Sequence, residues 1–159
     1  MSSKNTDLVD HGFMDARIKL IDVAAFLDRI ERHGQTDDYR FDALKNAITE
    51  KTKMVWFSSP CNPSGSVYSK KELQEISNVL ESHKGIFIVS DEIYEHINYK
   101  GGHHSIGGFD NVKDRTITVN GVSKAFAMTG WRIGYIGAPE WIARSCNKVQ
   151  GQVTSGANC

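Results

Sequence analysis

Residues 116–132 read TITVNGVSKAFAMTGWR, in which a short apolar strand at 116–119 leads into a turn that holds Lys124 and Arg132. A lysine amine forms a Schiff base with a carbonyl where an electrophile is held against it or where its pKa is lowered. An arginine suits a phosphate, because its planar fork donates two parallel hydrogen bonds. A molecule with both an aldehyde and a phosphate would use both residues, and pyridoxal phosphate is such a molecule. Taken alone, the same letters also fit a basic loop between two strands.

A second motif lies upstream, where the apolar run MVWF at 54–57 is followed by SSPCNPSG at 58–65. The run predicts a buried strand of a parallel sheet. Two prolines and a glycine then make the chain stop and turn. The turn places Asn62 at the carboxyl end of the strand, which is where open α/β sheets bind ligands. The alternative is that Asn62 only satisfies the backbone of its own turn.

The third motif is GIFIVSDEIY at 85–94, a strongly apolar strand that ends in a carboxylate. Asp91 at the end of a buried strand is costly unless it is paired or hydrogen-bonded. A protonated pyridine nitrogen would be such a partner, and Tyr94 follows three residues on. The alternative is that Asp91 caps a turn beginning at Glu92.

The three motifs together resemble the fold-type I pyridoxal-phosphate-dependent aminotransferases of class I/II. Asn-Pro-x-Gly at 62–65, SDEIY at 90–94 and SKAFAMTGWRIGY at 123–135 occur in the family's order. Their wording is most similar to bacterial aspartate and aromatic aminotransferases. The resemblance covers roughly residues 36–159.

This resemblance implies a catalytic role for three residues. Lys124 would hold the cofactor as a Schiff base and then move the proton in the 1,3-shift. Asp91 would pair with the pyridine nitrogen and keep it protonated. Tyr94, together with Asn62, would hydrogen-bond the phenolic oxygen of the cofactor.

The resemblance also implies the residues that bind phosphate and substrate. Arg132 would bind the phosphate, and Ser123 could donate a second hydrogen bond to it. Asn62 would also touch the α-carboxylate of the substrate. Some relatives have a serine where Gly121 stands, so one phosphate hydroxyl of the family pattern is absent. Full-length relatives are homodimers that act on an amino acid and a 2-oxo acid.

Members of the family are longer than this chain of 159 residues. We therefore expect a partial coenzyme-binding large domain at 35–159, without the small domain, the stacking aromatic residue or the arginine that binds the substrate carboxylate. Residues 1–34 form an unmatched segment, in which the spacing of apolar residues over 18–30 predicts an amphipathic helix. This helix would pack on its own domain, cover exposed sheet or bind a partner, or the segment was joined by a gene-model error.

The fold class that the pattern predicts is α/β, a mainly parallel sheet with flanking helices. Ser69 followed by Glu72 is a capping box. Leu73, Ile76 and Leu80 then form the buried stripe of the helix that it begins. The predicted strands are 54–57, 86–89, 116–119 and 133–136, and the predicted helices are 41–48, 69–82 and one that begins near Pro139.

Composition excludes several classes of protein. The net charge is zero and 40% of the residues are hydrophobic, so there is no electrostatic case for binding nucleic acid or an anionic membrane. No apolar run is long enough to span a bilayer. Cys61, Cys146 and Cys159 lack disulfide or metal spacing, which favours reduced thiols and a cytoplasmic location. His103 and His104 lie beside two glycines, which favours a solvated loop over a metal site.

The function that these observations predict is transamination through lysine-bound pyridoxal phosphate. Another enzyme with the same cofactor, such as a β-lyase or a decarboxylase, would share the lysine and the aspartate, because the protein only chooses which bond breaks. A non-catalytic fragment or an interaction module is the alternative from a different class. The sequence does not decide which amino acid is the substrate.

Overall fold

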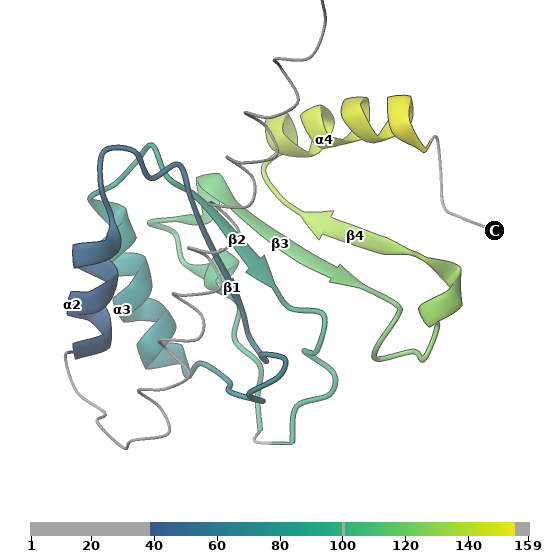
Figure 1. Ribbon diagram of the computed structural model, residues 1–159, viewed down its shortest axis with the longest axis horizontal. Helices are drawn as coiled ribbons and strands as arrows, with labels where there is room; N and C mark the ends of the chain where they lie inside the picture. Colours follow the sequence, from purple (N-terminus) through teal and green to yellow (C-terminus); the bar gives the residue numbers. More distant parts are fainter. Residues whose placement is uncertain (1–38, 100, 155–159) are drawn as a thin grey trace, which may run out of the picture. The chain divides into compact units, whose positions relative to one another are not determined.

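The computed structural model describes residues 39–99 and 101–154, whose elements are labelled in Figure 1. The chain divides into two compact units, Met1–Arg40 and Phe41–Cys159, and nearly all of the first lies outside the described residues. The helix predicted at 18–30, the predicted boundary between residues 34 and 35, and Cys159 also lie outside them.

A four-stranded sheet forms the centre of the described unit (Figure 1). The spatial order follows the sequence, and the first three strands are parallel. The fourth strand is antiparallel to the third, since the segment that joins them holds a 3-10 turn and no crossover helix. The prediction of a mainly parallel α/β sheet is therefore confirmed. The strands are β1 (Met54–Ser58), β2 (Phe87–Asp91), β3 (Thr116–Gly121) and β4 (Gly134–Gly137).

Within the described residues, three α-helices accompany the sheet: α2 (Tyr39–Ala47), α3 (Lys70–Glu81) and α4 (Glu140–Val153). The predicted capping box begins α3. The backbone N–H of Glu72 donates to Oγ of Ser69 at 3.2 Å, and the backbone N–H of Ser69 donates to Oε2 of Glu72 at 2.8 Å. Such a cap is worth about 1 kcal/mol. None of the helices in the described residues has both the length and the apolar character needed to cross a membrane.

The hydrophobic core lies between α3 and one face of the sheet. Leu73, Ile76 and Leu80 are buried, as their helical spacing predicted. They pack against apolar side chains of β2 and of the segments on either side of it, and Leu44 of α2 is partly buried against the cluster. The remaining buried members are Ile86, Ile88, Ile106 and Val112.

One prediction about the sheet is wrong. The run at 54–57 was expected to be buried, but Met54 is 45% exposed and Trp56 is 51% exposed. These two side chains alternate with Val55 and Phe57, which pack against the core. Met54 and Trp56 lie on the face of the sheet opposite α3. On that face α4 reaches β2, where the ring centroid of Trp141 lies 5.8 Å from that of Phe87, and the two side chains of β1 stay exposed.

Candidate functional site

The three sequence motifs meet at the carboxyl ends of β1, β2 and β3, because parallel strands end on the same side of a sheet. Two backbone hydrogen bonds tie the ends of β1, β2 and β3 together. The N–H of Ser59 donates to the carbonyl of Asp91 at 3.1 Å, and the N–H of Glu92 donates to the carbonyl of Val119 at 2.9 Å. The loops that carry the predicted site residues therefore leave the sheet from neighbouring points.

Asn62 lies in a closed turn after β1. The N–H of Gly65 donates to the carbonyl of Cys61 at 2.7 Å, and Gly65 has a φ of 70°, a conformation that glycine adopts without a Cβ clash. The side-chain Nδ2 of Asn62 donates to the hydroxyl oxygen of Tyr94 at 3.1 Å. The side-chain amide of Asn62 therefore bonds to Tyr94, another predicted site residue, in addition to any role in its own turn.

Lys124 lies next to Tyr94. Its Nζ is 5.7 Å from the centroid of the Tyr94 ring, a distance at which a cation is attracted by the ring face. The lysine is exposed and sits in a turn in which the N–H of Ala127 donates to the carbonyl of Lys124 at 3.1 Å. Ala127 has a left-handed φ of 53°. Asn62, Tyr94 and the amine of Lys124 therefore form one cluster.

Asp91 is the last residue of β2 and is half-buried. Its Oδ1 accepts from the backbone N–H of Ile93 at 3.2 Å. This bond matches the alternative interpretation, in which Asp91 caps a turn. It uses one carboxylate oxygen and leaves the other to accept from a ligand.

Arg132 and Ser123 belong to the same loop as Lys124 but make no bond to the cluster in the described residues. Arg132 ends a 3-10 turn in the left-handed conformation, with φ 53°, and its Nη1 donates to the carbonyl of Thr129 at 3.1 Å. Ser123 is half-buried just after β3. Within the described residues, no hydrogen bond or ion pair joins either of them to Asn62, Asp91 or Lys124. Their assignment to a phosphate stays a prediction.

β3 and β4 approach each other closely at Gly121. A Cβ placed on it would lie 2.8 Å from the backbone oxygen of Ile133 and 3.2 Å from Cα of Gly134. Real Cβ atoms essentially never approach backbone so closely, so a serine would force β4 away from β3.

A hollow of about 410 Å³ opens beside Asn62 and Tyr94, which both line its wall together with Pro60, Cys61 and Val67. Its size is within the range of small-molecule sites. Asp91 and Lys124 do not line it, so it adjoins the cluster without enclosing it.

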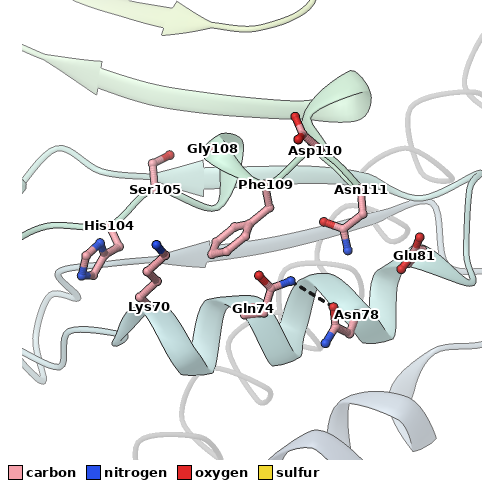
Figure 2. A pocket seen from close by; sticks show the side chains of 10 residues that line it. All are labelled: Lys70, Gln74, Asn78, Glu81, His104, Ser105, Gly108, Phe109, Asp110 and Asn111. Carbon is pink, nitrogen blue, oxygen red and sulfur yellow. Dashed lines mark hydrogen bonds between the residues drawn. The ribbon is translucent and has the colours of Figure 1, made fainter.

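A larger hollow of about 590 Å³ lies between α3 and residues 104–111 (Figure 2). Its wall is polar, and several of its side chains already bond to neighbours. Gln74 donates to Asn78 at 3.0 Å, and Lys113 holds the pKa of Asp110 below its usual value through a 2.6 Å hydrogen bond. None of the six predicted site residues lines it. Size alone therefore does not make it the site.

The prediction that the paired histidines form a solvated loop is wrong for His103. Its side chain is 16% exposed, and its Nε2 lies 2.7 Å from Oε2 of the buried Glu92. His104 is exposed, as expected. Sequence reasoning missed the pair because its members are eleven positions apart in an irregular segment. The signal that could have found it is a glutamate next to a buried strand, since such a charge needs a partner.

Comparison with known proteins identifies the family. Residues 10–159 match the family Aminotransferase class I and II. The chain belongs to this family. The match begins at residue 10, within the segment 1–34 to which the sequence motifs did not extend. The family uses pyridoxal phosphate.

Individual relatives give the same result. The chain is 51% identical over 110 residues to an aspartate aminotransferase of Pyrococcus abyssi, covering 69% of this chain and 28% of that protein. It is 47% identical over 116 residues to an aspartate aminotransferase of Bacillus subtilis, covering 72% and 29%. An aromatic aminotransferase structure from Pyrococcus horikoshii superposes with a TM-score of 0.69 at 45% identity, covering 73% and 31%. This member of the family thus spans about three tenths of the length of these relatives.

The residues present fit pyridoxal phosphate. The hydroxyl of Tyr94 accepts from Asn62, which leaves its own proton free to donate to a ligand oxygen. The amine of Lys124 lies over the ring of Tyr94, 5.7 Å from its centroid, and Asp91 ends β2 with one carboxylate oxygen available. An amine, a hydroxyl donor and a carboxylate acceptor are the groups that the aldehyde, the phenolic oxygen and the ring nitrogen of the cofactor require.

Proposed function

We propose that this chain provides the lysine-bearing part of an aminotransferase that transfers an amino group between an amino acid and a 2-oxo acid. The observation that carries the proposal is the cluster of Asn62, Tyr94 and Lys124. These residues follow β1, β2 and β3 in turn, so three separate segments of the chain contribute to it. Membership of the aminotransferase family supports it. A cytoplasmic location stays a prediction from the cysteine pattern.

Asp91 and each residue of the cluster would have a defined task. Pyridoxal phosphate, when bound, supplies the electron-withdrawing ring that stabilises negative charge on the substrate carbon. The amine of Lys124 would bind the cofactor covalently and then move a proton to and from the substrate. Asp91 would hold a proton at the ring nitrogen through its free oxygen. Tyr94 and Asn62 would donate hydrogen bonds to the phenolic oxygen.

The outer residues would hold the charged ends of cofactor and substrate. Arg132 is exposed, so its guanidinium can reorient from the carbonyl of Thr129 to a phosphate. Ser123 would donate its hydroxyl to the same phosphate. Asn62 would also contact the α-carboxylate of the substrate. In a full-length protein, we expect the homodimer of the relatives.

The test separates cofactor binding from turnover. Purified chain is titrated with pyridoxal phosphate and followed by visible absorbance, and transfer of the amino group from aspartate, glutamate and aromatic amino acids to 2-oxoglutarate or oxaloacetate is then measured. A chimaera in which residues 39–154 replace their counterpart in the Bacillus subtilis aspartate aminotransferase is measured beside it.

We expect weak cofactor binding and little turnover by the chain alone, because positioning of the substrate is worth roughly 7–11 kcal/mol and the chain spans about three tenths of its relatives. The chimaera should transfer amino groups, and Lys124→Ala should abolish its activity. An active Lys124→Ala chimaera would contradict the proposed role of the lysine. Elimination or decarboxylation without transfer would favour the other enzymes that use the same cofactor.

A further inference from the structure

A buried carboxylate separates two residues of the candidate site. Glu92 directly follows Asp91 and precedes Tyr94 by two positions, and it is only 2% exposed. Burying a carboxylate is costly unless donors satisfy its oxygens. The proposed function gives Glu92 no contact with cofactor or substrate, so its burial calls for another explanation.

Three donors surround this carboxylate. The hydroxyl groups of Ser90 and Ser105 donate to Oε1 at 2.8 and 2.7 Å, and Nε2 of His103 lies 2.7 Å from Oε2. Two hydroxyl donors and one imidazole nitrogen thus satisfy both oxygens of the buried side chain. These contacts join the end of β2 to residues 103–105, which lie further along the segment between β2 and β3.

The side chain of Glu92 points away from the site. Ser90 and Asp91 are consecutive in β2 and face opposite sides of the sheet, with Ser90 on the face that carries α3. The side chain of Glu92 lies on the same side as Ser90, because the two are hydrogen-bonded at 2.8 Å. Glu92 therefore influences Asp91 through the backbone and not by direct contact.

Two backbone hydrogen bonds of Glu92 connect it to the residues of the site. The N–H of Glu92 donates to the carbonyl of Val119 at 2.9 Å, and its own carbonyl accepts from the N–H of Glu95 at 2.9 Å. The turn between these two bonds contains Tyr94, whose hydroxyl meets Asn62. A shift of Glu92 would displace both Asp91 and Tyr94.

We propose that Glu92 is a positioning residue, whose bond to His103 holds the turn from Asp91 to Tyr94 in the arrangement that binds the cofactor. That this arrangement binds the cofactor rests on the proposed function. That the bond between Glu92 and His103 sets the position of Tyr94 does not depend on it.

A metal ion is the competing explanation, because Glu92, Glu95 and His103 bring potential ligand atoms within 4.8 Å of one another. Two ligands at 2.0–2.1 Å from one tetrahedral ion lie about 3.3 Å apart. Oε2 of Glu92 and Nε2 of His103 are 2.7 Å apart, which is a hydrogen-bond distance. The geometry is that of a bonded pair.

The test compares two variants of the pair with a matched buried control in the 159-residue chain. Glu92→Gln removes the charge with little change of shape, and His103→Gln is a milder change that keeps a donor. Ser77→Ala removes a hydroxyl that is equally buried in α3 and bonds to the carbonyl of Gln74 at 2.8 Å. All three should lower the thermal midpoint.

The first measurement needs no cofactor. Tyrosine is labelled at the ring carbon that bears the hydroxyl, and the resonance of Tyr94 is assigned as the one lost in Tyr94→Phe. We expect it to shift or broaden in Glu92→Gln and His103→Gln and to stay in place in Ser77→Ala. The second measurement is affinity for pyridoxal phosphate. It should fall about tenfold in either variant and no further in the double variant, since both act through one bond.

The outcomes separate this inference from the proposed function. An unchanged Tyr94 resonance in both variants would overturn the positioning role. Unfolding of both variants while Ser77→Ala stays folded would assign the pair to stability alone and would also overturn it. A shifted resonance, together with a chimaera that neither binds pyridoxal phosphate nor transfers amino groups, would support the positioning of Tyr94 and count against the proposed function.

Discussion

The side-chain amide of Asn62 donates to the hydroxyl of Tyr94 at 3.1 Å, across 32 positions of sequence. The bond joins the loop after β1 to the turn after β2. Because the hydroxyl oxygen of Tyr94 accepts this bond, its proton can donate to a ligand. The amine of Lys124 lies 5.7 Å from the centroid of the same ring. A polar cluster of this kind can direct two donors at one ligand atom.

Lys124 should be the one lysine that bonds covalently to pyridoxal phosphate. Its amine lies 5.7 Å from the centroid of the Tyr94 ring, within the candidate site. Borohydride reduction of the cofactor-loaded chain followed by peptide mapping should place the label on Lys124. Label on another lysine, or equal label in Lys124→Ala, would disprove the assignment.

Asp91→Asn should impair turnover more than cofactor binding. A neutral amide cannot hold the ring nitrogen protonated, and the loss of such a charge pair corresponds to about a thousandfold in rate. Single-turnover kinetics and cofactor affinity are compared in the chimaera described above. Near-normal rates would mean that Asp91 serves only its bond to the N–H of Ile93.

Gly121→Ala should destabilise the chain by roughly 1–3 kcal/mol, because its Cβ would lie 2.8 Å from the backbone oxygen of Ile133. Gly137→Ala is the matched control in the neighbouring strand, where the nearest atom to an added Cβ is 4.0 Å away. Urea denaturation gives both free energies of unfolding. Equal effects of the two substitutions would contradict the steric account.

Ala127→Gly should raise the free energy of unfolding by up to about 1 kcal/mol, since glycine avoids the Cβ clash of a left-handed backbone. Ala125→Gly is the control in the same turn. Ala125 is not left-handed, so glycine there should lower stability by roughly 0.4–1 kcal/mol. A loss of stability in both variants would show that the left-handed conformation of Ala127 carries no penalty.

The strands and the buried stripe of α3 were predictable because their signals are local. Apolar spacing places Leu73, Ile76 and Leu80 on one helix face, and the capping box marks where α3 begins. The exposure of Met54 and Trp56 was not predictable, because it depends on what packs against the face of the sheet opposite α3.

The Glu92–His103 pair was missed for a related reason. Its members lie in an irregular segment, where no periodicity relates positions eleven apart. The close approach of β3 and β4 at Gly121 was equally invisible, since the sequence shows only that a hydroxyl is absent there.

The amino-acid sequence by itself determined the family, the order of the strands along the chain and the chemical types gathered in the candidate site. Motif wording and hydrophobic periodicity are properties of neighbouring residues, so they can be read without a fold. Only the tertiary structure decided that Asn62 meets Tyr94, that Lys124 lies over the same ring and that Glu92 is buried against His103. These contacts arise because parallel strands bring their carboxyl ends to one edge, and distances between loops depend on the register of the whole sheet.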